Sequence, residues 1–428
     1  MVIGLDGLSW PLLNQLISAG VMPNTASLLA DSEAGPMKSV RPEISPAAWT
    51  SFFTAAEPSR HGIYGFTDFE PGGYDIRFNA STDVKIPPIW DWLSLRNQRC
   101  MVLNVPLTYP ARPVSGVMVS GFVSLDYDRA GYPSWVADFL RRSGYALEAD
   151  FERVHRDRPA FQADLDRALA GRDMLFDRFS GEDWDLFVLV VTDTDRLCHF
   201  FLKEFLEDGP VTNYFLDFFR RVDALVGKAA SLAEQLNRAG DSTDLVLLSD
   251  HGFAPVIGEF HLNRWLASKG YLNEVGPGAA ALALDPTRIY FNGPPRFTSG
   301  RVSPSDYDRL AQAISADLVR EPAVAGIDRR RDLYDGPLAH QAPDLVVHPV
   351  EGYEFKAKFT PGDVYTESPL KGTHTFDNAF FLWRSYQGEP PKSEIRDIVD
   401  LGVRLFQRHG VEPPVGNVNG AADGAIIL

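Results

Sequence analysis

The sequence has few cysteines, no long hydrophobic run and a shortage of positive charge. Cys100 and Cys198 are the only cysteines among 428 residues, which excludes a disulfide-stapled scaffold and favours a reducing cytoplasm. No apolar run approaches the roughly 20 residues that a membrane-spanning helix needs. The first residues show neither the basic segment nor the cleavage site of a secretory signal. We therefore expect a cytoplasmic protein with no membrane partner.

The charge balance excludes another class of partner. The formal net charge is −16, whereas binding to a nucleic-acid polymer needs concentrated Lys and Arg. A hydrophobic content of 45% and a charged content of 23% are typical of a globular protein with ample core. An acidic protein can still bind phosphate if metal ions supply positive charge locally. Composition therefore indicates an enzyme or binding protein of small solutes, and it leaves the oligomeric state open.

Apolar runs that alternate with helical segments predict the fold class. Strands are expected at 2–5, 100–105, 117–121, 186–191, 245–249 and 379–383. Helices are expected at 133–143, 158–180, 212–238 and 394–408. Strands that are unbroken apolar runs are typical of a parallel sheet covered by helices on both faces. The prediction is an α/β protein with a largely parallel central sheet.

The composition changes between residues 253 and 369. Gly and Pro become frequent, the expected strands become shorter, and Ser303-Pro304 marks the start of one helix. We interpret 253–369 as an inserted subdomain, with 1–252 and 370–428 forming the core. Residues 60–82, rich in Gly, aromatics and Asp, are expected to be an ordered loop.

Acidic residues follow three of the predicted strands. Asp6, Asp195 and Asp250 lie at or just past strand ends, and α/β sheets build their sites at the carboxyl ends of strands. Three acids at one sheet edge would repel each other unless cations lay among them. Taken alone, Asp250-His251-Gly252 is also an ordinary strand-to-loop turn. The other ligands along the chain decide between these interpretations.

One set of candidate ligands is an Asp-x-x-x-His pair. Asp195 and His199 are four residues apart, so on a helix their side chains share a face and can reach one ion. His374 would add a second imidazole. A carboxylate with two imidazoles leaves a position open for water or substrate.

A second set of matching type combines Asp6, Asp250 and His251, with Ser45 as a candidate fourth ligand. Two ions about 3.5–4 Å apart can clamp the attacking and leaving oxygens in phosphoryl transfer. Ser45 is predicted to be a helix N-cap, with Pro46 at the first helical position. A helix N-terminus favours an anion, and metal coordination would lower the pKa of the hydroxyl. Ser45 is therefore the candidate nucleophile.

Three residues near these motifs are interpreted as structural. His61 is predicted to be a structural loop residue and Asp193 a turn residue after its strand. Cys198 is predicted to pack in the interior, because its side chain leaves the helix on a different face from His199.

The candidate residues lie in five short segments. In chain order these are Ile3-Gly4-Leu5-Asp6-Gly7, Ser45 through Trp49-Thr50-Ser51-Phe52, Asp195-Arg196 to His199-Phe200, Ser249-Asp250-His251-Gly252-Phe253 and Gly372-Thr373-His374. Together they resemble the type I phosphodiesterase/nucleotide pyrophosphatase family of the alkaline phosphatase superfamily. The resemblance extends from residue 2 to residue 385, which makes it far more specific than any single motif.

The resemblance implies an alkaline-phosphatase-like fold and two divalent metal ions, usually zinc, with manganese as an alternative. It implies one ion held by Asp195, His199 and His374, and another held by Asp6, Ser45, Asp250 and His251. It also implies a covalent phosphoseryl intermediate on Ser45 that water then hydrolyses. The family's nucleophile is often Thr, whereas the phosphatase branch uses Ser, so the choice between monoester and diester stays open.

The expected function is hydrolysis of a phosphodiester or pyrophosphate bond in a small nucleotide-type substrate. A phosphomonoesterase remains an alternative, as does a phosphotransferase or mutase of the same superfamily, because their metal sites would look alike. A sulfatase would need Cys or Ser followed by x-Pro-x-Arg, and Ser45-Pro46-Ala47-Ala48-Trp49 lacks that order. The complete ligand set argues against a non-catalytic phosphate-ester-binding protein.

Overall fold

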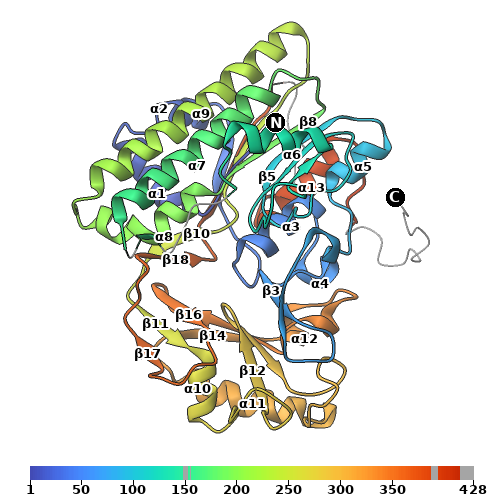
Figure 1. Cartoon of the computed structure of the whole chain (residues 1–428), viewed down its shortest axis with the longest axis vertical. Coiled ribbons are helices and arrows are strands. Elements are labelled where there is room, and N and C mark those ends of the chain that lie inside the picture. Colours follow the sequence, from blue (N-terminus) through green and yellow to red (C-terminus); the bar gives the residue numbers. More distant parts are fainter. Residues whose placement is uncertain (148–152, 155, 387–393, 415–428) are drawn as a thin grey trace.

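An eight-stranded sheet forms the centre of the molecule (Figure 1). The computed structural model describes residues 1–147, 153–154, 156–386 and 394–414. The strands lie in the order β2 (Glu33–Met37), β19 (Ala379–Arg384), β9 (Leu245–Leu248), β1 (Val2–Leu5), β8 (Leu186–Val191), β5 (Cys100–Val105), β6 (Gly116–Ser120) and β7 (Gly131–Tyr132). Neighbours from β9 to β6 pair in parallel, whereas β2–β19, β19–β9 and β6–β7 are antiparallel. The predicted largely parallel α/β sheet is confirmed.

Helices cover both faces of this sheet, because successive strand residues point to opposite sides. Ile3 and Leu5 of β1 pack in one core and Val2 packs in the other. The first core includes residues of α1 (Trp10–Ser18), α2 (Pro23–Ala30), α6 (Ser134–Ser143), α7 (Arg158–Phe179), α8 (Asp193–Leu206) and α9 (Thr212–Ala239). The second includes residues of α3 (Ser45–Thr54), α5 (Ile89–Leu95) and α13 (Ile398–Arg408). None of the helices in the described part of the chain has the length and apolar character of a membrane span.

A second group of strands lies at the carboxyl edge of the main sheet, in the lower part of Figure 1. One of its sheets has the order β12 (Ala281–Leu284), β13 (Arg288–Phe291), β15 (Leu345–Pro349) and β14 (Val324–Arg329). The other has the order β16 (Tyr353–Lys356), β11 (Gly258–His261) and β17 (Tyr365–Thr366). With α10 (Leu262–Ser268) and α11 (Tyr307–Leu318) they enclose a separate hydrophobic core. The inserted subdomain is confirmed, while its boundaries at residues 253 and 369 stay a prediction; residues 415–428 of the predicted core lie outside the described residues.

A two-stranded ribbon connects the main sheet to the subdomain. Strand β10 (Gly252–Pro255) leaves the core and pairs antiparallel with β18 (Gly372–Thr375), which returns to it. Gly252 lies opposite Thr375, and Pro255 lies opposite Gly372. The ribbon therefore begins and ends beside two of the predicted ligands, His251 and His374.

The segment expected to be a loop at 60–82 contains a β-hairpin. Strands β3 (Thr67–Phe69) and β4 (Ile76–Phe78) pair antiparallel. Phe69 packs in the subdomain core, with its ring centroid 5.0 Å from that of Phe297. Short strands separated by Gly-rich sequence have little periodicity, so the loop prediction missed this second contact between core and subdomain.

Candidate active site and metal centre

Three adjacent strand ends bring the predicted acidic residues together. Strands β9, β1 and β8 are neighbours in the sheet, and Asp250, Asp6 and the helix with Asp195 follow their carboxyl ends. The Thr194 hydroxyl donates to the Asp6 carbonyl over 2.6 Å, which ties the start of α8 to the end of β1. Topology alone therefore gathers carboxylates from distant parts of the sequence at one sheet edge.

Ser45 lies at the start of α3 and points at this edge. Its Oγ is 3.4 Å from Asp6 Oδ1 and 3.3 Å from His251 Nε2. The N-cap is Ile44, which makes no side-chain cap, so the prediction of Ser45 as N-cap is wrong by one residue. The Ser45 hydroxyl faces the acidic residues instead of capping the first turn. This orientation suits a nucleophile better than a helix cap.

The residues Asp195, His199 and His374 form what we call the pocket-side set. His374 Nε2 lies 3.2 Å from Asp195 Oδ1 and 3.0 Å from His199 Nε2. His199 Nε2 lies 3.4 Å from the same carboxylate oxygen. The helical spacing of Asp195 and His199 and the ribbon position of His374 thus aim three ligand atoms at one point.

The residues Asp6, Asp250 and His251 form what we call the buried set. His251 Nε2 is 3.6 Å from Asp6 Oδ1, 3.5 Å from Asp250 Oδ2 and 3.9 Å from Asp195 Oδ1. The Gly7 backbone N–H donates to Asp250 Oδ1 over 3.1 Å. Asp250 Oδ2 is buried and has no hydrogen-bond partner among the described residues. Asp195 lies within reach of both sets, which joins them into one site.

The three imidazoles share one hydrogen-bonding pattern, in which Nδ1 faces a backbone carbonyl. The Nδ1–H groups of His199, His251 and His374 lie 3.0, 3.1 and 3.1 Å from the backbone carbonyls of Gly372, Gly252 and Glu43. Donation to a carbonyl fixes the tautomer and leaves the Nε2 lone pair free to bind a metal. Backbone geometry therefore prepares all three rings as ligands.

Burial controls the protonation of the imidazoles. It lowers the pKa of His251 to about 3 and that of His199 to about 4, so both rings are neutral near pH 7. Burial also opposes protonation of His374, but the adjacent Asp195 carboxylate raises the pKa of this ring above its ordinary value.

The pKa values of the three carboxylates also depart from their ordinary values, and not all in the same direction. Burial, followed by the charges of Asp250 and Asp195, raises the pKa of Asp6 well above its ordinary value. Burial raises the pKa of Asp250 to about 6. Burial would also raise the pKa of Asp195, but His199 and Arg196 beside it lower that pKa below its ordinary value. The Arg196 guanidinium donates to Asp195 Oδ2 over 2.8 Å.

This arrangement fits divalent cations. Mutually repelling buried carboxylates, an unpartnered Asp250 oxygen and two Nε2 atoms 3.0 Å apart all need positive charge between them. Mixed carboxylate and imidazole ligands are of the type that binds divalent transition metals.

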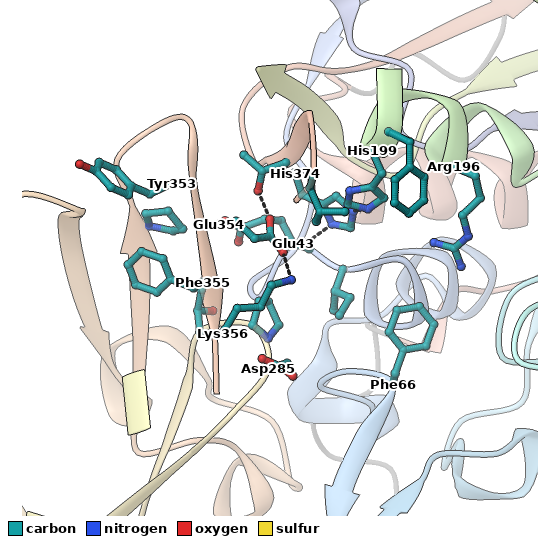
Figure 2. A pocket seen from close by; sticks show the side chains of 17 residues that line it. Glu43, Phe66, Arg196, His199, Asp285, Tyr353, Glu354, Phe355, Lys356 and His374 are labelled. Atoms are coloured by element: carbon teal, nitrogen blue, oxygen red, sulfur yellow. Dashed lines mark hydrogen bonds and ion pairs between the residues drawn. The ribbon is translucent and has the colours of Figure 1, made fainter. Parts of the chain in front are cut away.

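A pocket of about 300 Å³ opens beside the pocket-side set (Figure 2). One wall belongs to the core and includes His199, His374 and Arg196. The opposite wall belongs to the subdomain and includes Glu354 and Lys356 of β16. A small substrate group attached to a phosphoryl group at the site would extend into this space.

The residues interpreted as structural lie away from the ligand atoms, with two corrections. His61 is not a loop residue: it ends the short helix α4 (Pro58–His61), where it is buried and its Nε2 lies 2.9 Å from Ser51 Oγ. Cys198 packs in the core between helices. Asp193 is not a turn residue: it is the first residue of α8, and its carboxylate is 3.1 Å from Arg172. The Asp193 carboxylate therefore forms an ion pair with the buried Arg172 and does not join the ligands.

Besides Arg196, two further residues at the site were not predicted from the sequence. Trp49 donates from Nε1 to Asp6 Oδ2 over 2.9 Å, which orients that carboxylate. Glu354 accepts a hydrogen bond from Thr373, the neighbour of His374. Trp49 follows Ser45 by one helical turn, a spacing that could have indicated it. The alternation in Tyr353-Glu354-Phe355-Lys356 indicates a strand but not what its charged face meets.

The sheet, its inserted subdomain and the carboxylate–imidazole edge define the fold class as alkaline-phosphatase-like. The family described as type I phosphodiesterase/nucleotide pyrophosphatase matches residues 1–377. The chain belongs to this family, and it is an enzyme of a class that hydrolyses phosphate esters. A search of curated proteins finds no match.

Solved structures show the same fold at low identity. Phosphonoacetate hydrolase from Sinorhizobium meliloti, in complex with phosphonoformate, is 17% identical with a TM-score of 0.63, covering 94% of each chain. Murine ectonucleotide pyrophosphatase/phosphodiesterase 5, an inactive variant in complex with AMP, is 14% identical with a TM-score of 0.59. That match covers 96% of this chain and 95% of the murine one.

Proposed function

We propose that the chain is a two-metal phosphohydrolase that cleaves a phosphodiester or pyrophosphate bond through Ser45. One observation carries this proposal: carboxylate oxygens and three Nε2 atoms converge on one sheet edge, with the Ser45 hydroxyl 3.3 Å from His251 Nε2. A single-ion or purely structural site would not need two ligand sets that meet where Asp195 approaches His251 and that border a serine hydroxyl.

The two sets would divide the ligands. Asp195, His199 and His374 would hold one ion. Asp6, Asp250 and His251, with Ser45, would hold the other; Asp6 and His251 also form a group with Asp195, and Asp250 Oδ2 lies 3.5 Å from His251 Nε2. When bound, the ions supply the positive charge that lowers the hydroxyl pKa and neutralises the phosphoryl oxygens. Zinc is the proposed metal and manganese the alternative.

The chain's own residues then account for two displacements at phosphorus. The Ser45 hydroxyl loses its proton to solvent, its Oγ forms a bond to phosphorus while the bond to the leaving group breaks, and the leaving group takes up a proton from solvent. Water then attacks the phosphoserine, so that the Oγ–P bond breaks and the phosphorylated product is released. Trp49 keeps Asp6 oriented beside Ser45 throughout, and the N-terminus of α3 favours the anionic group there.

The proposed substrate is small, phosphorylated and nucleotide-type. A pocket of about 300 Å³ suits a small organic group, and the solved relatives bind AMP and phosphonoformate. We keep the cytoplasm as the proposed location, because Cys100 and Cys198 are both buried free thiols. A nucleic-acid polymer is not among the proposed partners of a chain with net charge −16.

Replacement of the nucleophile tests the proposal. Ser45→Ala should lower turnover of bis(p-nitrophenyl) phosphate with zinc or manganese by roughly 10³-fold or more, because it removes the hydroxyl that lies beside Asp6 and His251. Ser51→Ala is the matched control, since Ser51 is on the same helix but contacts His61. Full activity of Ser45→Ala would exclude the covalent mechanism.

Product analysis separates the remaining alternatives. Faster release from p-nitrophenyl phosphate than from the diester would identify a phosphomonoesterase. Transfer of the phosphoryl group to an added alcohol in preference to water would identify a phosphotransferase or mutase.

A further inference from the structure

The subdomain reaches the metal-ligand strand through one carboxylate. Glu354 is on β16 of the subdomain and accepts a hydrogen bond from the Thr373 hydroxyl on β18. Lys356 Nζ donates to the other Glu354 oxygen over 2.8 Å. The Glu354 side chain is only 14% exposed, and Figure 2 shows it between Lys356 and His374. Both carboxylate oxygens therefore have fixed partners.

Thr373 directly precedes His374 on β18. Successive strand residues point to opposite sides, so anchoring the Thr373 side chain fixes the backbone from which the His374 ring projects. The same ribbon is tied to α8, because the Lys371 backbone N–H donates to the His199 carbonyl over 2.6 Å. Both imidazoles of the pocket-side set thus depend on the placement of β18.

Glu354 also places charge beside the pocket-side set. Burial would raise its pKa, but Lys356 and then His199 and His374 lower it to about 2, so the carboxylate is ionised near pH 7. An ionised carboxylate close to the two imidazoles favours a cation between them.

We propose that Glu354 is a positioning residue of the metal site: it fixes β18 through Thr373 and so strengthens the hold of the pocket-side set on its ion. The inference rests on the proposed two-metal function and extends the site into the subdomain. It makes the subdomain part of the metal centre as well as a wall of the substrate pocket.

Glu259 provides a matched control on the neighbouring strand. It lies directly opposite Glu354 in the β11–β16 pairing. Its carboxylate accepts hydrogen bonds from Thr366 over 3.1 Å and Ser368 over 3.3 Å, on the subdomain side of the ribbon. Glu259→Gln therefore changes the same charge at nearly the same place without touching Thr373.

The test is a calorimetric zinc titration of the metal-free full-length variants. Glu354→Ala and Thr373→Val should each weaken one of two binding events by roughly 10–100-fold, the usual cost of losing a partner that orients a ligand. The double variant should be no weaker than either single variant, because the two residues act through one contact. Thr373→Ser keeps the hydroxyl and should bind both ions as the wild type does, as should Glu259→Gln.

The outcomes separate this inference from the proposed function. If the wild type binds fewer than two ions, the two-metal function fails. If the wild type binds two ions and Glu354→Ala and Thr373→Val bind both equally well, the role of Glu354 is wrong. An equal loss in Glu259→Gln, or a loss in Thr373→Ser, would also overturn it by showing general loosening. Thermal unfolding of each metal-free variant confirms that the compared proteins are folded.

Discussion

The two ligand sets have the same chemistry but different access to solvent. In the pocket-side set the His199 and His374 side chains are 13% and 18% exposed, whereas Asp250 and His251 in the buried set are fully inaccessible. Asp195 of the pocket-side set contacts His374 and also lies 3.9 Å from His251 of the buried set. We therefore expect the pocket-side set to exchange ions and contact substrate more readily than the buried set beside Ser45. Access, and not ligand type, distinguishes the two halves of the site.

The two sets also differ in the free energy needed to keep their carboxylates charged. Asp6 and Asp250 are buried next to each other, and burial penalises their charged forms. We therefore expect removal of metal to destabilise the buried set more than the pocket-side set, where the Arg196 guanidinium already compensates Asp195. The following predictions test this contrast.

The largest effect is expected in the buried set. Asp250→Asn should lower turnover by roughly 100-fold or more through loss of an ionised ligand. The metal-free form of the same variant should be more stable than the metal-free wild type by roughly 1–3 kcal/mol near pH 7. Asn keeps the acceptor for the Gly7 N–H and removes the buried charge. Activity assays and urea unfolding of the metal-free proteins measure the two effects.

The pH dependence gives the sign of the stability effect. The pKa of Asp250 is about 6 in the folded protein, against about 3.9 for an unfolded Asp, so the folded state binds its proton more tightly. The contribution of Asp250 to the stability of the metal-free wild type should therefore be lost as the pH rises from about 4 to 6 and then level off. A smaller loss is expected in Asp250→Asn. An equally steep loss in the variant would contradict this account of the buried set.

An intermediate effect is expected in the pocket-side set. His199→Ala should lose one of two ions and lower turnover by roughly 100-fold, while the second ion stays bound.

Timed treatment of the wild type with a chelator should remove one equivalent of metal well before the other, because the pocket-side ligands are accessible. Elemental analysis at each time point measures the loss. His340→Ala, which removes an exposed imidazole, is the control for His199→Ala. Release of both ions from the wild type at one rate would contradict the difference in access between the two sets.

The smallest effect is expected outside both sets. Ser51→Ala removes the hydroxyl beside His61 and should lower the free energy of unfolding by about 1 kcal/mol, the typical net value of a buried hydrogen bond. Metal content and turnover should stay at wild-type levels. A loss of metal in this variant would show that His61 supports the site, against its assignment as a structural residue.

Much of the fold and the grouping of candidate ligands follow from local sequence. Continuous apolar runs predicted the parallel strands, because a strand buried on both faces has no polar side. The positions of Asp6 and Asp250 at strand ends, and the helical spacing of Asp195 and His199, predicted that these side chains would meet. The structure brings them together, while their roles in metal binding and catalysis stay predictions.

The remainder depends on contacts that local sequence does not encode. Asp193 reads as a turn residue until the buried Arg172, 21 positions earlier, is placed beside it. The hairpin at β3–β4 is stabilised by the subdomain core, not by its own periodicity. Glu354 looks like any charged strand residue until Thr373 is known to lie against it.

The ribbon of β10 and β18 has a consequence for how this enzyme could change over evolution. Pro255 and Gly372 face each other across the ribbon, so its two strands would form an ordinary β-hairpin if a short turn joined them. The whole subdomain is in effect an expanded hairpin turn. Such a turn can be lengthened or shortened while His251 and His374 keep their places, provided that Glu354 still accepts from Thr373, which allows substrate preference to diverge around one reaction centre.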